Sequence, residues 1–65
     1  MLTIRQQSVL SMLEAWGMSG LTTSAIARDI GAPEPSIRRT IQELIRLGHN
    51  ISYASDGLYY YRKGY

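Results

Sequence analysis

Arginine and glutamine side chains recur at helical spacing between residues 38 and 46, in the order Arg38, Arg39, Gln42 and Arg46. The guanidinium fork of arginine matches the N7 and O6 acceptors of guanine, and the glutamine amide matches the edge of adenine. Arginine also binds phosphate oxygens through paired hydrogen bonds. This set of side chains therefore indicates a surface able to bind nucleic acid, provided that all of them lie on one exposed face of a helix.

The apolar residues of the same segment predict how that helix is oriented. They recur at intervals of three and four over residues 33–47, which is typical of an amphipathic helix. A rotation of 100° per residue then turns the polar residues toward solvent. The inward positions are Ile37, Ile41, Leu44 and Ile45, and the outward positions are Pro35, Arg38, Arg39, Gln42 and Arg46.

Within this segment we expect the contacts to divide between bases and phosphates. Ser36, Arg39 and Gln42 are predicted to read base edges. Arg46, at the far end of the helix, is better placed for a phosphate, and Arg38 suits either role.

Two acidic residues of this helix allow a different interpretation. Glu43 lies four residues after Arg39 and three before Arg46, so these residues can form a solvated ladder of charges worth a few tenths of a kcal/mol per pair. Glu34, near the helix start, favours the helix dipole, but its carboxylate repels phosphates unless it accepts from cytosine N4.

A shorter helix is predicted just before this one, over residues 22–31. Ile26, Ala27 and Ile30 form its apolar stripe, and Gly31 supplies a left-handed C-terminal stop. The small side chain of Ala27 lets two helices cross closely. The two helices are thus expected to form a helix-turn-helix.

The start of this shorter helix is a candidate phosphate site. Thr22 or Thr23 can cap it, and the unpaired N–H groups near Thr22, Thr23 and Ser24 can bind an anion. Arg28 can add a second contact to the DNA backbone.

A first helix is expected over residues 3–17. Thr3 and Gln6 have the spacing of a capping box. Apolar residues from Ile4 to Trp16 recur at intervals of three and four, so Trp16 is predicted to pack in the core, because a core this small needs its aromatic residues.

After Asn50 the period changes to an alternating one, which predicts a hairpin over residues 50–62 with its turn at Asp56-Gly57. We place Leu58 and Tyr60 toward the helices, and Tyr59 and Tyr61 on the other face as a possible dimer or partner contact. The opposite assignment stays open, because tyrosine suits both environments. Arg62 and Lys63, which leave the hairpin, are expected to contact the DNA backbone.

The order helix, helix, turn, helix, hairpin resembles the winged helix-turn-helix superfamily over nearly the whole chain. The likeness is to small bacterial and phage transcription regulators, including the biotin-repressor-like group, and it implies a mostly α fold of three helices and a two-stranded wing, with the third helix entering the major groove. Two departures are Pro33, where the family often has serine or threonine, and the acidic hairpin tip at Asp56. The matching residues are Ile26-Ala27, Ile30-Gly31, Ser36-Ile37, Ile41, Leu44 and Gly48.

Composition narrows the classes of function further. A chain of 65 residues has room for one small core, so a single domain spanning residues 1–65 is expected. It has no cysteine, one histidine (His49) and no phosphate-loop or nucleophile-elbow pattern, which argues against an enzyme, a metal site or a cofactor. No apolar run is long enough for a membrane span or signal peptide, so a cytoplasmic protein is expected.

The sequence therefore predicts a transcription regulator that binds double-stranded DNA and acts as a homodimer or a cooperative oligomer, because one helix reads too few base pairs. The net charge is only +2, and its excess lies in the C-terminal half. Two alternatives remain open: a winged-helix module that binds protein through Tyr59 and Tyr61, and an excisionase-like architectural DNA-binding protein. No small-molecule substrate is evident.

Overall fold

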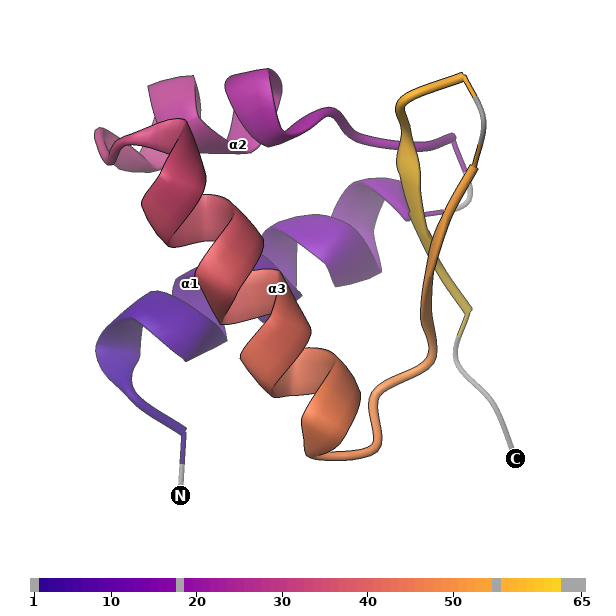
Figure 1. The fold of residues 1–65 in the computed structure, drawn as a ribbon, viewed down its shortest axis with the longest axis horizontal. Helices are drawn as coiled ribbons and strands as arrows, with labels where there is room; N and C mark the ends of the chain where they lie inside the picture. Colours follow the sequence, from indigo (N-terminus) through magenta and orange to yellow (C-terminus); the bar gives the residue numbers. More distant parts are fainter. Residues whose placement is uncertain (1, 18, 55, 63–65) are drawn as a thin grey trace.

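The structure, a computed structural model, describes residues 2–17, 19–54 and 56–62. Three helices, α1 (Ile4–Trp16), α2 (Thr23–Ile30) and α3 (Glu34–Arg46), precede an antiparallel hairpin of β1 (Ile51–Tyr53) and β2 (Tyr59–Tyr61). Helix α3 crosses in front of α1, with α2 at one end and the hairpin at the side (Figure 1). This arrangement confirms the predicted fold class, mostly helical with a C-terminal wing.

The helix ends follow from local hydrogen bonds. The Thr3 hydroxyl accepts from the Gln6 N–H at 3.1 Å, and the Gln6 side chain accepts from the Thr3 N–H at 2.9 Å, so the capping box is present. Thr22, not Thr23, caps α2. Gly31 ends α2 with φ +79°, a left-handed conformation that glycine adopts without a steric penalty. Helix α3 begins after Pro33 without a side-chain cap.

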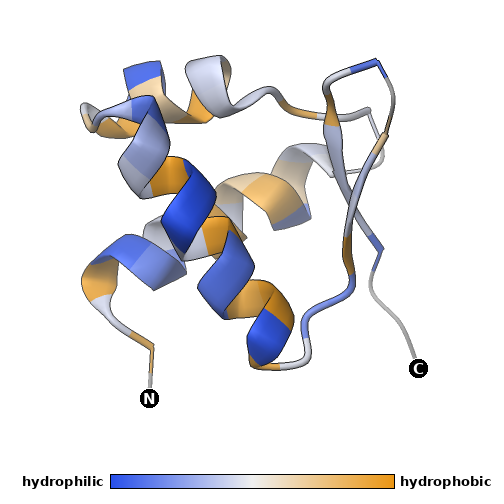
Figure 2. Ribbon diagram, in the orientation of Figure 1, coloured by the Kyte–Doolittle hydropathy of each residue, from blue (hydrophilic) through white to orange (hydrophobic). Residues whose placement is uncertain are grey.

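The core lies where the three helices meet. Six of its side chains are fully buried, and half of them come from α3, whose sequence alternates between hydrophilic and hydrophobic along the ribbon (Figure 2). Burying each such aliphatic side chain stabilises the fold by about 1.5–3 kcal/mol. Helix α3 is thereby docked on the core from Ile37 to Leu44. The six residues are Val9, Leu13, Ile26, Ile37, Ile41 and Leu44.

Several apolar residues predicted to be inside are exposed instead. Trp16 is 58% exposed, so the prediction that it packs in the core is wrong. It lies 100° around the helix from Gly17, and it is Gly17 that meets the hairpin backbone. Ile4 lies half a turn from Leu13 and is 84% exposed. Ile45 is 39% exposed because it lies 100° around the helix from the buried Leu44.

The connector between α1 and α2 pairs with the hairpin. Leu21 and Tyr59 exchange two backbone hydrogen bonds of 2.9 and 2.7 Å, and the Tyr61 N–H donates to the Gly17 carbonyl at 3.3 Å. The approach at Gly17 is so close that a Cβ there would lie 2.7 Å from the Tyr61 carbonyl oxygen. Strand β2 is therefore paired on both edges, by β1 and by the connector.

The hairpin faces are the reverse of the assignment favoured from sequence. Tyr53 pairs with Tyr59, and Tyr59 is buried, whereas Tyr60 is turned to the outer face. A two-residue Asp-Gly turn would have paired Tyr53 with Tyr60. Instead the Ala54 N–H donates to the Leu58 carbonyl around a three-residue loop, and this shift of one residue exchanges the two faces of β2.

A partly buried hydrogen bond links α2 and α3. The Thr23 hydroxyl donates to Oε1 of Glu34 at 3.1 Å, and Arg38 lies 3.5 Å from the same oxygen. Thr23 is buried, whereas Arg38 is exposed. A second contact, from the Gln6 amide to Glu43 at 3.0 Å, ties α1 to α3. Two carboxylates of α3 thus serve helix packing.

Replacing Thr23 with valine tests the crossing contact. Thr23→Val keeps the side-chain shape but removes the donor to Glu34, and we expect the free energy of unfolding to fall by about 1–2 kcal/mol, measured by urea unfolding. Arg38→Gln is the matched control, because an exposed (i, i+4) ion pair is worth about 0.5 kcal/mol or less. Equal losses in the two variants would contradict this role for Thr23.

The hairpin tip is held by its own carboxylate. Asp56 accepts from the Leu58 N–H through Oδ1 and from the Tyr60 hydroxyl through Oδ2, both at 3.0 Å. The hydrogen bond from Tyr60 keeps its proton in place, and together with partial desolvation and the negative charge of Asp56 it raises the pKa of Tyr60. The acidic tip is therefore engaged within the hairpin.

This contact predicts an alkaline transition at the tip. Because the pKa of Tyr60 is raised by folding, its contribution to stability is complete below the ordinary tyrosine value of about 10 and is lost as the pH rises through the folded pKa. In Asp56→Asn the pKa of Tyr60 should move back toward its ordinary value, measured by NMR titration of the tyrosine Cζ carbons. Tyr60→Phe identifies the resonance, and an unchanged pKa in Asp56→Asn would contradict the assignment.

Candidate nucleic-acid interface

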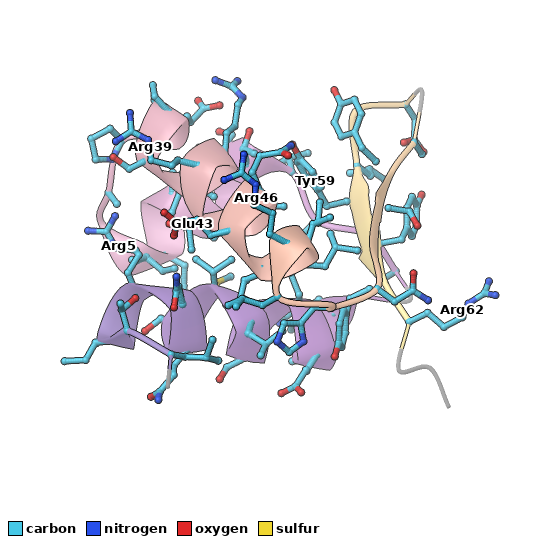
Figure 3. The ribbon with its side chains drawn as sticks, turned by 60° about the horizontal axis from the view of Figure 1, so that its bottom comes forward. Arg5, Arg39, Glu43, Arg46, Tyr59 and Arg62 are labelled. Atoms are coloured by element: carbon cyan, nitrogen blue, oxygen red, sulfur yellow. The ribbon has the colours of Figure 1, made fainter. Side chains whose placement is uncertain are left out.

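The outer face of α3 carries the polar side chains that the helical rotation placed there. All five of the predicted outward residues are exposed, and Ser36 beside them is half-buried. Arg39 and Arg46 project from the helix toward solvent (Figure 3). Arg39, Gln42 and Arg46 follow one another at intervals of three and four, so they form one stripe along the helix. The exposed residues are Pro35, Arg38, Arg39, Gln42 and Arg46.

The predicted charge ladder along this stripe is not present. Glu43 accepts from Gln6 on α1 instead of pairing with Arg39 or Arg46. Among the residues that the structure describes, the single ion pair is that of Arg38 with Glu34. The guanidinium groups of Arg39 and Arg46 thus have no acidic partner in the described part of the chain. They are available to an external anion.

At the N-terminus of α2, fewer groups are free to bind a phosphate than the sequence suggested. The Thr22 hydroxyl already accepts from a first-turn N–H, and the Thr23 hydroxyl is buried against Glu34. That carboxylate also places a negative charge near the positive end of the helix. What stays open to a phosphate is the exposed Ser24 together with the backbone N–H groups of the first turn.

Arg28 is exposed in the last turn of α2. It lies four residues after the exposed Ser24, so the two side chains are neighbours on one face of the helix. Its predicted contact with the DNA backbone stays a prediction.

The hairpin contributes a different aromatic residue from those predicted. Tyr59 is buried and Tyr61 is half-buried against the core, so they do not form the exposed patch that we expected on the outer face. Tyr53 is 65% exposed, and its ring centre lies 4.8 Å from that of Tyr59. Ile51 and Tyr53 are two residues apart in β1 and therefore share one face of the hairpin. Nothing in the sequence indicated that Tyr53, at the end of this strand, lies beyond the core.

Arg62 lies apart from the arginines of α3. It follows β2 at the base of the hairpin, where its N–H donates to the Asn50 carbonyl at 3.1 Å, and Figure 3 places it far from Arg39 and Arg46. Its predicted contact with the DNA backbone stays a prediction. Lys63 lies outside the described residues.

Other kinds of site find no support within the described ranges. No group of three His, Asp or Glu residues that could hold a metal ion occurs there. None of the described helices is long and apolar enough to cross a membrane.

Comparisons with known proteins identified no relative of this chain. No protein family, characterised protein or solved structure matches this chain at a significant level.

Proposed function

We propose that this protein binds double-stranded DNA in a sequence-specific manner, with α3 in the major groove, and acts as a small transcription regulator. The observation that carries the proposal is the stripe of Arg39, Gln42 and Arg46, exposed on a helix whose opposite side is fully committed to the core. The major groove is about 12 Å wide and admits one helix. A helix fixed along its inner side can present such a stripe with little loss of conformational entropy on binding.

The positions along α3 give each side chain a role. Arg39 and Gln42, in the middle of the exposed stripe, are suited to guanine and adenine respectively, and Ser36 lies one turn before them. Arg46, in the last turn, contacts a phosphate, and Arg38 adds a weaker phosphate contact because it is shared with Glu34. Ser24 and the first-turn N–H groups of α2 hold the backbone on the other side of the groove.

A single copy offers a small interface for this task. One small DNA-binding module buries about 600–1,000 Å² of its own surface, and specific regulators usually combine two of them. We therefore propose that the protein binds as a homodimer or as a cooperative array on repeated sites.

Substitutions along the stripe test the proposal on a duplex selected from a random-sequence pool. Arg39→Gln should weaken the selected duplex by about 1–3 kcal/mol and relax the preference at one base pair. Arg46→Gln should weaken selected and random duplexes alike and reduce the slope of log K against log salt by about 1. The measurement is a titration by fluorescence anisotropy at several salt concentrations.

Arg5→Gln is the matched control, because Arg5 is an exposed arginine on α1 and is not among the residues assigned a DNA contact above. It removes the same charge and should leave specificity unchanged. Affinity that does not fall with salt, or an Arg5→Gln loss equal to that of Arg39→Gln, would overturn the proposal.

A further inference from the structure

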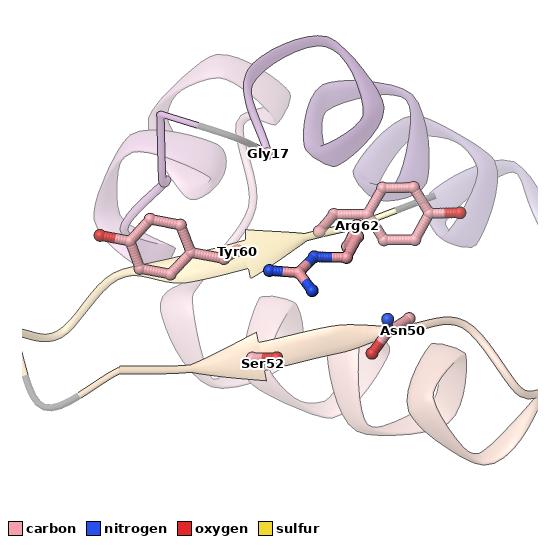
Figure 4. Close-up of a pocket in the computed structure, with 6 residues that line it drawn as sticks. Gly17, Asn50, Ser52, Tyr60 and Arg62 are labelled. Atoms are coloured by element: carbon pink, nitrogen blue, oxygen red, sulfur yellow. The ribbon is translucent and has the colours of Figure 1, made fainter. Parts of the chain in front are cut away.

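A hollow lies on the outer side of the hairpin and extends to the C-terminal end of α1 at Gly17. Its volume is about 320 Å³, near the lower end of the range for small-molecule sites. Ser52 of β1 is paired with Tyr60 of β2, and Asn50 and Arg62 lie next to each other just beyond the strand ends (Figure 4). Its lining consists of Gly17, Asn50, Ser52, Tyr60, Tyr61 and Arg62.

The polar side chains of this hollow have hydrogen-bonding capacity to spare. Arg62, Asn50 and Ser52 line it together, and none of these side chains hydrogen-bonds to a described residue. Arg62 supplies a planar fork of five donors, and the other two supply an amide and a hydroxyl. The described residues that line the hollow include no carboxylate, so the charge of Arg62 is not neutralised there.

The ring of Tyr60 forms an aromatic wall at one end of the hollow and contacts the rest of the chain in two places. The Tyr60 hydroxyl donates to Asp56 at 3.0 Å, and its ring lies against the connector, where a Cβ on Gly20 would come within 3.0 Å of the ring. The ring is thus restrained at its hydroxyl and along one edge. A restrained aromatic face favours stacking of a flat ligand, because little rotamer freedom is lost on binding.

The floor of the hollow is equally fixed. Strand β2 is paired on both edges, and at the base of the hairpin the Arg62 N–H donates to the Asn50 carbonyl. The connector closes one side at Gly17, where no side chain larger than hydrogen fits beside Tyr61. An aromatic wall, together with donors that have no partner among the described residues, is suited to a ligand that is flat and acidic.

From this geometry we propose that the hollow binds a small organic acid in which a carboxylate is attached to a single flat ring. The carboxylate pairs with the Arg62 guanidinium, with Asn50 and Ser52 donating to its remaining lone pairs, and the ring stacks on Tyr60. This inference does not depend on DNA binding by α3, because no residue of that helix lines the hollow.

Benzoate is a suitable probe, measured by the shifts it causes in the ¹⁵N–¹H spectrum of the full chain. We expect saturable shifts at residues 50, 52, 60 and 62, with binding about tenfold weaker in Arg62→Gln. Asn50→Ala should also weaken binding. Arg46→Gln removes an equivalent charge from α3 and should bind benzoate as the natural protein does.

Two further probes separate the parts of the proposal. Benzamide keeps the ring without the charge, and acetate keeps the charge without the ring, so both should bind more weakly than benzoate. Equal binding of benzamide would overturn the role of Arg62, and equal binding of acetate would overturn the role of Tyr60. Absence of saturable shifts at these four residues would overturn the site itself.

A duplex titration distinguishes this site from a DNA contact. If Arg62 serves a small acid, Arg62→Gln should lower duplex affinity much less than Arg46→Gln does. A loss equal to that of Arg46→Gln, with benzoate binding unchanged, would show that the guanidinium serves the DNA backbone and would overturn the proposal. Failure of the duplex experiments as a whole leaves the benzoate result intact.

Discussion

The core beneath α3 is the constraint on which the rest of the structure depends. In a chain of 65 residues there is room for one core only, and three of its six fully buried side chains, Ile37, Ile41 and Leu44, come from this helix. Removing any of them would leave a cavity that so small a protein has little other packing to offset. The inner side of α3 is therefore committed, and only its opposite side is open to a partner.

A second constraint ties the hairpin to this core. A hairpin of two strands is marginal on its own, but β2 is also paired with the connector at Leu21 and packed on the core through Tyr59. The pairing fixes which side of the hairpin meets the helices. It also gives the hairpin a separate outer face, where Tyr60 and Arg62 line a hollow to which no residue of α3 contributes. The two proposed sites are distinct for this reason.

The helices could be predicted from sequence because their signals are local. The capping box at Thr3, the left-handed Gly31 and the apolar period of α3 all act within a few residues, and each is present in the structure. The failures have causes that local patterns do not contain. Whether Tyr59 or Tyr60 faces the core depends on a single residue in the loop, and no sequence period distinguishes a two-residue from a three-residue turn that ends in glycine.

Contacts between residues far apart in the sequence determine which charged side chains already have a partner within the chain. From sequence, Glu34, Glu43 and Asp56 reduce the positive charge of the C-terminal half. In the structure each of these carboxylates accepts a hydrogen bond from a side chain of the same chain, whereas Arg39 and Arg46 have no acidic partner in the described part of the chain. The carboxylates keep their negative charge, but the guanidinium groups of Arg39 and Arg46 are open to donate hydrogen bonds to an external anion. In the proposed DNA complex two such arginines would neutralise few phosphates, each contributing only about 0.9 to the salt dependence, and this is why the proposal includes a second copy of the chain on the same DNA.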